Sequence, residues 1–469
     1  MTDNTPTSSG RTLRRQLSLT DLVFLSFGGQ AALLSLLTYA TGVIIQVGEF
    51  APISIVIGTL IVLFNAMAVY GLSKRYGEAG GYYIYAFYSL TRRLGLETGW
   101  MYILYSVIYG SAYVAGSAYV LRYVLHIDPL LAALIVFIPA ALFLITGIRP
   151  SARYAEVASI IEISVLAYIV ISNLFIAGFR FYNPFSHRVI SEVTPGLLAV
   201  SLLFAIGIPT GYGSITPLGG EAIRKEDVGK AAIIVVISGG LLTAAVIYTL
   251  IDASIMTHSI NYVLAARVPV LDFLRKYYGY FAAAPLLFAA FNDGVLAPLS
   301  FMAATSRTIY AMAKNQMLPA SLAALKGDHP FNSVIATVVL YTLTSIGVLA
   351  AYERPLTVFL VYGSIAGLAN LFVHISGDFS YFLEGVRGLR RALTYTSLKS
   401  FKWVFQKVSD IIIAVIATAI SMWALLSTFR SNGIQLELDI FVAWILIGFI
   451  YAEILDELQA YRGRAEAER

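Results

Sequence analysis

Long apolar segments recur along the chain, and short polar or glycine-rich connections separate them. A membrane-spanning helix needs about 20 mostly apolar residues. Residues 77–87 are too short and too interrupted to span, and predict a helix at the membrane interface. Residues 259–278 are amphipathic and predict a surface helix on the other side. The long apolar segments predict an all-α integral membrane protein with twelve transmembrane helices, at residues 19–45, 52–73, 97–124, 129–148, 154–178, 196–218, 231–256, 280–312, 333–352, 356–376, 408–429 and 438–457.

Composition and charge agree with this pattern. Hydrophobic residues make up 58% of the chain and charged residues only 13%, whereas soluble domains average about 45–50% and about 25%. A soluble or intrinsically disordered protein is therefore excluded. With twelve helices, most of the 32 Lys and Arg residues fall in the tails and in the connections on one side. The positive-inside rule then predicts a multi-pass plasma-membrane protein with both termini cytoplasmic. The net charge of +5 reflects this topology, so no nucleic-acid partner is expected.

Several kinds of chemistry lack the residues they need. The chain has no cysteine, which excludes disulfides, thiolate metal sites and cysteine nucleophiles. Its five histidines are scattered and form no helix-borne pair for a metal ion. No phosphate-binding G-x-x-x-x-G-K-[ST] motif and no clustered catalytic set occurs. We therefore expect no metal, no cofactor and no enzymatic activity.

Two predicted spans contain breaks in their helical pattern. Residues 26–32 hold Gly28 and Gly29, and residues 205–217 combine three glycines with two prolines. In lipid, such breaks survive where they line a cavity. A matched pair of interrupted helices, five spans apart, indicates a transporter built from inverted repeats, in which half-helix N-termini point free N–H groups at an anionic group such as a carboxylate. Packing or kinking is the alternative role for these glycines and prolines.

Motifs along most of the chain, roughly residues 18–380, resemble the amino acid–polyamine–organocation transporter family. The segment S-R-T-I-Y-A-M-A-K-N-Q-M-L-P is close to a family signature and is the most specific match. Other matching segments are A-G-G-Y-Y-I-Y (79–85), G-W-M-Y-I-L-Y (99–105), G-I-R-P-S-A-R (147–153) and T-G-Y-G-S-I-T-P-L-G-G-E (210–221).

The resemblance implies a leucine-transporter-like fold and transport of amino acids or related amines by alternating access. It divides the chain into a cytoplasmic tail (1–17), two inverted five-helix repeats (18–178 and 195–378), helices 11 and 12 (405–458) and a second cytoplasmic tail (459–469). We expect the first tail to be disordered. The substrate site implied by the broken helices comprises Gly28, Gly29, Gln30, Ala32, Phe204, Gly211, Tyr212, Gly213 and Ser214.

The sequence departs from the family in its first span. Relatives continue this span as G-x-x-G-x-G, but Ala32 and Leu34 occupy the second and third glycine positions here. The usual carboxylate cradle is altered, which leaves open a substrate amine without an α-carboxylate. Val295 and Leu296 are apolar where sodium-coupled relatives carry hydroxyl groups, which argues against a sodium site of that type.

Ionisable residues inside predicted spans are the candidates for ion coupling. Glu162 occupies the position in span 5 where proton-coupled relatives often have a lysine, and Asp293 follows an asparagine in span 8. An uncompensated charge at mid-bilayer costs at least about 2.5 kcal/mol, so protonation of such a carboxylate suits a proton carrier. A permanently neutral or hydrogen-bonded Glu162 and a helix-capping Asp293 are the alternatives.

Three further features complete the sequence-based hypothesis. Asn370, His374 and Asp378 share one face of span 10 and predict a structural polar seam, whereas Asp252, near the end of span 7, is expected to be solvated. Glu221 follows span 6 and is expected to pair with Arg14 or Arg15 as a cytoplasmic gate, unless these are simply solvated loop charges.

The sequence therefore predicts a secondary active transporter for a small-molecule substrate in the lipid bilayer, with protons as the coupling ion. A substrate-binding sensor without flux, or a channel, remains the alternative. The choice of substrate, symport or exchange, and the oligomeric state are not determined by the sequence.

Overall fold

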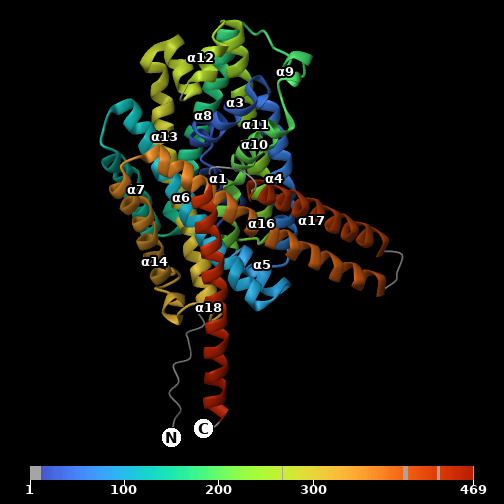
Figure 1. The fold of residues 1–469 in the computed structure, drawn as a ribbon. Coiled ribbons are helices and arrows are strands. Elements are labelled where there is room, and N and C mark those ends of the chain that lie inside the picture. The colour runs from blue at the N-terminus through green and yellow to red at the C-terminus, as the bar shows by residue number, and fades with distance from the viewer. Residues whose placement is uncertain (1–11, 267, 395–399, 430–433, 468–469) are drawn as a thin grey trace.

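The computed structural model describes residues 12–266, 268–394, 400–429 and 434–467, and Figure 1 shows the chain as a ribbon. Within these ranges the structure is helical, and strand-like pairing is limited to the isolated bridges Leu17–Ala222 and Lys326–His329. The first half of the chain forms α1 (Leu19–Gln30), α2 (Ala32–Leu37), α3 (Tyr39–Val47), η1 (Gly48–Phe50), α4 (Ala51–Ser73), α5 (Tyr82–Ser89), α6 (Arg92–Leu125), α7 (Pro129–Thr146), α8 (Ile148–Ala177), α9 (His187–Ser191) and α10 (Pro195–Gly207).

The second half begins with two short 3-10 turns and continues with the longest helices of the molecule. It forms η2 (Thr210–Ser214), η3 (Thr216–Gly220), α11 (Glu226–Met256), α12 (Ile260–Ala265), α13 (Pro269–Lys314), η4 (Ala320–Ala323), α14 (Phe331–Tyr341), the π-helical turn η5 (Thr342–Gly347), α15 (Val348–Tyr352), α16 (Pro355–Thr394), α17 (Ser400–Phe429) and α18 (Gln435–Ala467).

Eleven helical stretches among the described residues are long and apolar enough to cross a membrane. They lie where eleven of the predicted spans were placed. At the predicted sixth span, the apolar helix α10 has only 13 residues and ends at Gly207. Pro209 follows and lacks a backbone donor, so the chain continues through η2 and η3 as 3-10 turns. The chain is thus a multi-pass membrane protein.

The first predicted span is also interrupted. Helix α1 begins at a capping box formed by Ser18 and Asp21 and ends at Gln30. Ala31 then adopts the left-handed conformation with φ 46°, and α2 begins at the next residue. The N–H groups in the first turn of α2 therefore lack helical partners and must find others.

The central helices are the most enclosed by protein. Within the apolar 18-residue stretch of each helix, 94% of α6 is buried inside the molecule, compared with 22% of α17 and of α18. Helices α17 and α18 therefore lie at the periphery, and α18 extends beyond the rest of the chain in Figure 1. Helices α9 and α12 mark one end of the molecule, and α5 lies towards the other; these are called the α9–α12 end and the α5 end below.

Both predicted surface helices differ in detail from the structure. Residues 77–87 form a turn followed by α5, which is largely buried and packs against α6 and α16. Residues 259–278 do not form one helix, because α12 ends at Ala265 and α13 begins at Pro269. Helix α13 then kinks at Gly279, whose φ is 76°, before it enters the bundle.

The N-terminal tail was expected to be disordered as far as residue 17. Residues 1–11 lie outside the described part of the chain, but Leu13 and Leu17 are buried. The backbone N–H of Leu17 donates to the carbonyl oxygen of Glu221 at 2.9 Å, so the segment just before α1 is anchored to the connection after η3.

Candidate functional site

The two interruptions lie against each other at the centre of the molecule. A side chain at Gly211 would overlap the backbone of Gln30, and one at Gly29 would lie 2.8 Å from the carbonyl oxygen of Gly211 and press on Ser214. Only glycine permits this approach. The structure therefore brings together Gly29, Gln30, Gly211 and Ser214, four residues that the sequence assigned to one site.

Polar atoms at this junction lack partners within the protein. The hydroxyls of Ser26 and Ser214 and both amide atoms of Gln30 are buried without a hydrogen bond. The Gln30 amide lies against Gly239 of α11. Unsatisfied buried groups are rare in native proteins and call for an explanation such as a ligand.

Tyrosines of α6 satisfy the exposed backbone beside the interruptions. The hydroxyl of Tyr102 donates to the carbonyl oxygen of Gly213 at 2.8 Å, and that of Tyr105 donates to Thr210 at 3.4 Å. The hydroxyls of Tyr113 and Ser35 are 2.6 Å apart. These three tyrosines were not selected from the 30 in the sequence. Together with Tyr109 they recur at spacings of three or four, which places them on one helix face.

The remaining predicted substrate residues lie against different helices. Gly28 packs against Leu296 of α13, and Ala32 is fully buried at the start of α2. Phe204 packs on Gly42 of α3, where a Cβ added to the glycine would lie 2.9–3.2 Å from the phenylalanine ring. Tyr212 is fully buried and faces His374.

Two carboxylates bind the first turn of α2. The backbone N–H of Leu33 donates to Oε1 of Glu162 at 2.8 Å, and that of Leu34 donates to Oδ2 of Asp293 at 2.8 Å. The N–H of Ala32 also faces Glu162. Three helices that are far apart in the sequence, α2, α8 and α13, meet at this point.

The same two side chains contact each other, and each retains one free oxygen. Oε2 of Glu162 and Oδ1 of Asp293 are buried without a hydrogen-bond partner, and the two carboxyl groups interact directly. Two ionised carboxylates in contact repel each other, and they share a site most readily when one of them is protonated. The pair is therefore suited to holding one proton between these two oxygens.

Neighbouring polar contacts fix the positions of the helices that carry this pair. The hydroxyl of Tyr154 donates to Oδ1 of Asn292 at 2.8 Å, and Nδ2 of Asn292 donates to the carbonyl oxygen of Ala158 at 3.3 Å. The hydroxyl of Ser159 donates to Phe24 of α1 at 3.2 Å. Over the described residues, no group of three or more His, Cys, Asp or Glu side chains is placed to hold a metal ion.

A buried ion pair lies between η3 and α13. Nε of Arg307 donates to Oε2 of Glu221 at 2.8 Å, and a terminal guanidinium nitrogen donates to Oε1 at 2.9 Å. Both side chains are almost fully enclosed, at 1% and 2% exposed. The prediction that Glu221 pairs with Arg14 or Arg15 is wrong, because the guanidinium of Arg307 already binds both oxygens of Glu221.

Arg15 still contributes to the same region through backbone groups. Its guanidinium donates to the carbonyl oxygens of Ala222 and Gly77, each at 3.1 Å, while Arg14 is exposed. These contacts join the start of α1, the end of η3 and the turn before α5. Arg307 was missed although it lies in the segment with the most specific family resemblance, because that segment was used only to recognise the family.

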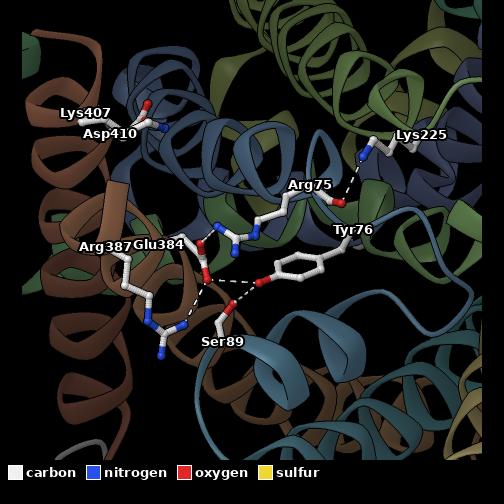
Figure 2. Close-up of polar contacts among 8 residues, drawn as sticks. All are labelled: Arg75, Tyr76, Ser89, Lys225, Glu384, Arg387, Lys407 and Asp410. Atoms are coloured by element: carbon white, nitrogen blue, oxygen red, sulfur yellow. Dashed lines mark hydrogen bonds and ion pairs between the residues drawn. The ribbon is translucent and has the colours of Figure 1, made fainter. Parts of the chain in front are cut away.

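A second ionic cluster lies near α5 and joins the ends of α4 and α16. Figure 2 shows Glu384 between Arg75 and Arg387, with ion pairs to both; the distance to Arg387 is 3.0 Å. The hydroxyl of Tyr76 donates to Glu384 at 3.1 Å and lies 3.1 Å from the hydroxyl of Ser89. Partial burial, the largest cause, raises the pKa of Tyr76, so its hydroxyl retains the proton that it donates.

Figure 2 also shows one contact that extends this cluster and a separate ion pair on α17. Nζ of Lys225 donates to the backbone carbonyl of Arg75 at 3.0 Å, which joins the start of α11 to the end of α4. Lys407 and Asp410 form an ion pair at 2.7 Å within α17, and Asp410 also accepts from Tyr381 of α16 at 2.6 Å. The cluster thus connects several elements near α5.

The predicted seam on α16 is buried, as its helical spacing indicated. Asn370, His374 and Asp378 are all buried. Nε2 of His374 lies 3.2 Å from the hydroxyl of Tyr212, and Nδ1 lies 3.3 Å from the hydroxyl of Tyr82. Asp252, in contrast, was expected to be solvated but is buried, and its Oδ1 accepts the N–H of Tyr182 at 2.8 Å. The loop after α8 folds over the end of α11 and covers it.

The helical bundle with its central polar junction defines the class of the protein, a polytopic membrane transport protein. The model of the amino acid permease family matches residues 21–468, nearly the whole chain. The chain therefore belongs to the amino acid permease family, whose members are transporters of small molecules and not enzymes. No curated protein matches the chain.

Proposed function

We propose that the protein is a secondary active transporter that moves amino acids or related amines by alternating access and couples this movement to protons. The contact of Glu162 and Asp293 with the first turn of α2 is the observation that carries the proposal. It places a titratable pair directly on the shorter half of an interrupted span.

The geometry supplies a way for a proton to influence this helix. An ionised carboxylate accepts a backbone N–H more strongly than a neutral carboxyl group does. Gain or loss of a proton by the pair therefore changes how firmly Leu33 and Leu34 are held against α8 and α13. A helix whose attachment depends on protonation can occupy two positions, which is the requirement for a population shift between states.

The surroundings favour a proton over a larger ion at this pair. Val295 and Leu296 lie two and three residues after Asp293 in α13. Both are apolar and buried. No third acidic side chain joins the pair within the described residues. A proton needs only one of the oxygens of this pair that lack a partner.

The contacts near α5 supply a gate in this proposal. The Arg307–Glu221 pair and the backbone contacts of Arg15 hold α13, η3 and the segment before α1 together. Separation of these contacts would open the molecule at the α5 end, which we assign to the cytoplasmic side of the plasma membrane. The two five-helix repeats, residues 18–178 and 195–378, would rearrange around the central junction.

The test is uptake by purified protein in liposomes, with an imposed pH gradient and a panel of radiolabelled amino acids and the amines putrescine and spermidine. The wild type is expected to accumulate at least one substrate when the gradient is present. Glu162→Gln and Asp293→Asn should exchange this substrate without responding to the gradient. Glu156→Gln is the matched control, because Glu156 lies on the same helix outside the pair, and it should behave as the wild type.

Three results would contradict the proposal. Full gradient dependence in Glu162→Gln and Asp293→Asn would remove the pair as the coupling site. Binding of a substrate without uptake under any gradient would instead support the sensor alternative, and conductance without saturation would support a channel.

A further inference from the structure

A buried polar cluster lies between α5, η2 and α16. It consists of Tyr82, Tyr212, His374 and Asp378 and is termed the Asp378 cluster. The His374 ring bridges the two tyrosine hydroxyls, with ring centroids 5.4 Å from Tyr82 and 5.5 Å from Tyr212. The cluster therefore connects the unwound segment after α10 to the α5 helix through side chains alone.

Asp378 is the unusual member of this cluster. Its side chain is 2% exposed, and Oδ2 is buried with no hydrogen-bond partner. Tyr82 and Tyr212 are close enough to interact with it electrostatically. A buried carboxylate without a partner is costly, so this oxygen requires a proton or a cation.

Among the residues that the structure describes, no Lys or Arg side chain forms a hydrogen bond with Oδ2 of Asp378. The sequences of α5 and η2 contain no Lys or Arg. On α16, Arg387 pairs with Glu384. The enclosed guanidinium of Arg307 is bound on both sides by Glu221. Neither α5 and η2 nor these two paired arginines therefore supply a cation to Asp378.

The chemistry of the cluster fits an ammonium group. A carboxylate forms charge-assisted hydrogen bonds with an ammonium, and tyrosine faces attract cations. The hydroxyl oxygens of Tyr82 and Tyr212 can also accept a hydrogen bond from an ammonium group. A carboxylate ligand would meet only like charge and aromatic rings here.

On the other side of the junction, acidic side chains already engage the backbone N–H groups in the first turn of α2. The free N–H groups of α2 at Leu33 and Leu34 already bind Glu162 and Asp293. The donors that a substrate carboxylate would use in this half-helix are therefore occupied.

We infer that the Asp378 cluster binds the ammonium group of an amine or amino acid ligand, with Asp378 as the anionic partner and Tyr82 and Tyr212 as aromatic walls. This inference rests on the proposed function in one respect, namely that amines or amino acids are the ligands. It names the group that is recognised and the residues that recognise it.

Binding is measured by isothermal titration calorimetry on the purified full chain, without any transport. The ligands are putrescine, lysine and leucine, together with N-acetylated putrescine, lysine and leucine in which each amino group is blocked. The wild type is expected to bind at least one amine and to bind its acetylated counterpart at least tenfold more weakly. Asp378→Asn is expected to weaken amine binding at least tenfold, and Asp378→Glu to restore part of it.

Asp410→Asn is the matched control, because Asp410 is a mostly buried acid on the neighbouring helix whose partners are known. It should bind as the wild type does. Equal binding of amines by wild type and Asp378→Asn would overturn the inference, as would equal binding of free and acetylated ligands by the wild type. The latter comparison needs no variant and holds even if Asp378→Asn does not fold.

The outcome is separable from that of the proposed function. Amine binding that depends on Asp378, with no response of uptake to a pH gradient, would retain the site and reject the proton coupling. Gradient-driven uptake with binding independent of Asp378 would do the opposite. A wild-type protein that binds none of these amines at millimolar concentration would also overturn the inference.

Discussion

Glu162 and Asp293 accept the N–H groups of consecutive residues, Leu33 and Leu34, although the two acidic residues lie far apart in the sequence, on α8 and α13. This arrangement makes one turn of α2 the meeting point of α8 and α13. It also leaves one oxygen of each carboxyl group without a partner. The relationship turns two isolated membrane carboxylates into a single titrating unit, in which the proton count belongs to the pair.

The contact between the two interruptions predicts a strict requirement for glycine. Gly211→Ala places a methyl group on the backbone of Gln30, where backbone atoms cannot yield as a flexible side chain would. Overpacking of this kind typically costs about 1–3 kcal/mol, and we expect a lower thermal unfolding midpoint in detergent. Gly367→Ala is the control, because a Cβ there meets nothing within 4 Å. An unchanged midpoint in Gly211→Ala would show that the two segments are not in contact.

The sequence predicted the spans well because apolar length alone identifies a membrane helix. It placed the sixth span as one segment over residues 196–218, whereas α10 ends at Gly207, because Pro209 and the glycines that follow favour 3-10 turns. Depth in the membrane was sufficient to select Glu162 and Asp293 individually. Their contact could not be predicted, because it depends on how three distant helices pack.

For charged residues near the ends of the helices, the sequence did not predict the partner or the burial. Glu221 was selected from its place after span 6, but its partner was sought among the nearest arginines of the tail. The structure pairs it with Arg307, 86 residues away. Asp252 was assigned to solvent by its position near a helix end, yet the chain after α8 folds back and covers it. Sequence position indicates depth along a helix, but not what a loop covers.

The Arg307–Glu221 pair predicts a large loss of stability when one partner is removed. Arg307→Met leaves the carboxylate of Glu221 buried and unpaired, which costs about 3–5 kcal/mol when a buried pair is broken in this way. Replacing both residues, in Arg307→Met with Glu221→Leu, should recover much of the loss. Thermal unfolding in detergent measures both effects.

Arg93→Met serves as the control for the ion pair, because Arg93 and its partner Asp456 are solvent-accessible. Its midpoint should stay close to that of the wild type. If Arg307→Met were as stable as Arg93→Met, the Arg307–Glu221 ion pair would not stabilise the folded protein as predicted.

His329 predicts a dependence of stability on acid pH. It lies between η4 and α14, where burial, the largest cause, and the nearby charge of Arg307 lower its pKa from 6.5. The folded protein therefore holds His329 neutral, while the unfolded chain takes up a proton as the pH falls through about 6.5. The contribution of His329 to stability is complete above that pH and declines below it.

His329→Gln should accordingly lose less stability than the wild type between pH 7.5 and pH 5.5, measured as the shift in thermal midpoint. His187→Gln, at an exposed histidine, is the matched control and should follow the wild type. The same shift in His329→Gln and wild type would mean that this histidine does not carry the dependence.

The most direct test of the central claim is to record proton movement when a transported substrate is added outside liposomes that contain the purified protein and a pH-sensitive dye. Wild type and Glu156→Gln are expected to acidify the lumen as substrate enters, whereas Glu162→Gln and Asp293→Asn should admit substrate down its own concentration gradient without acidification. Equal acidification by all four proteins would contradict the assignment of the Glu162–Asp293 pair as the proton site.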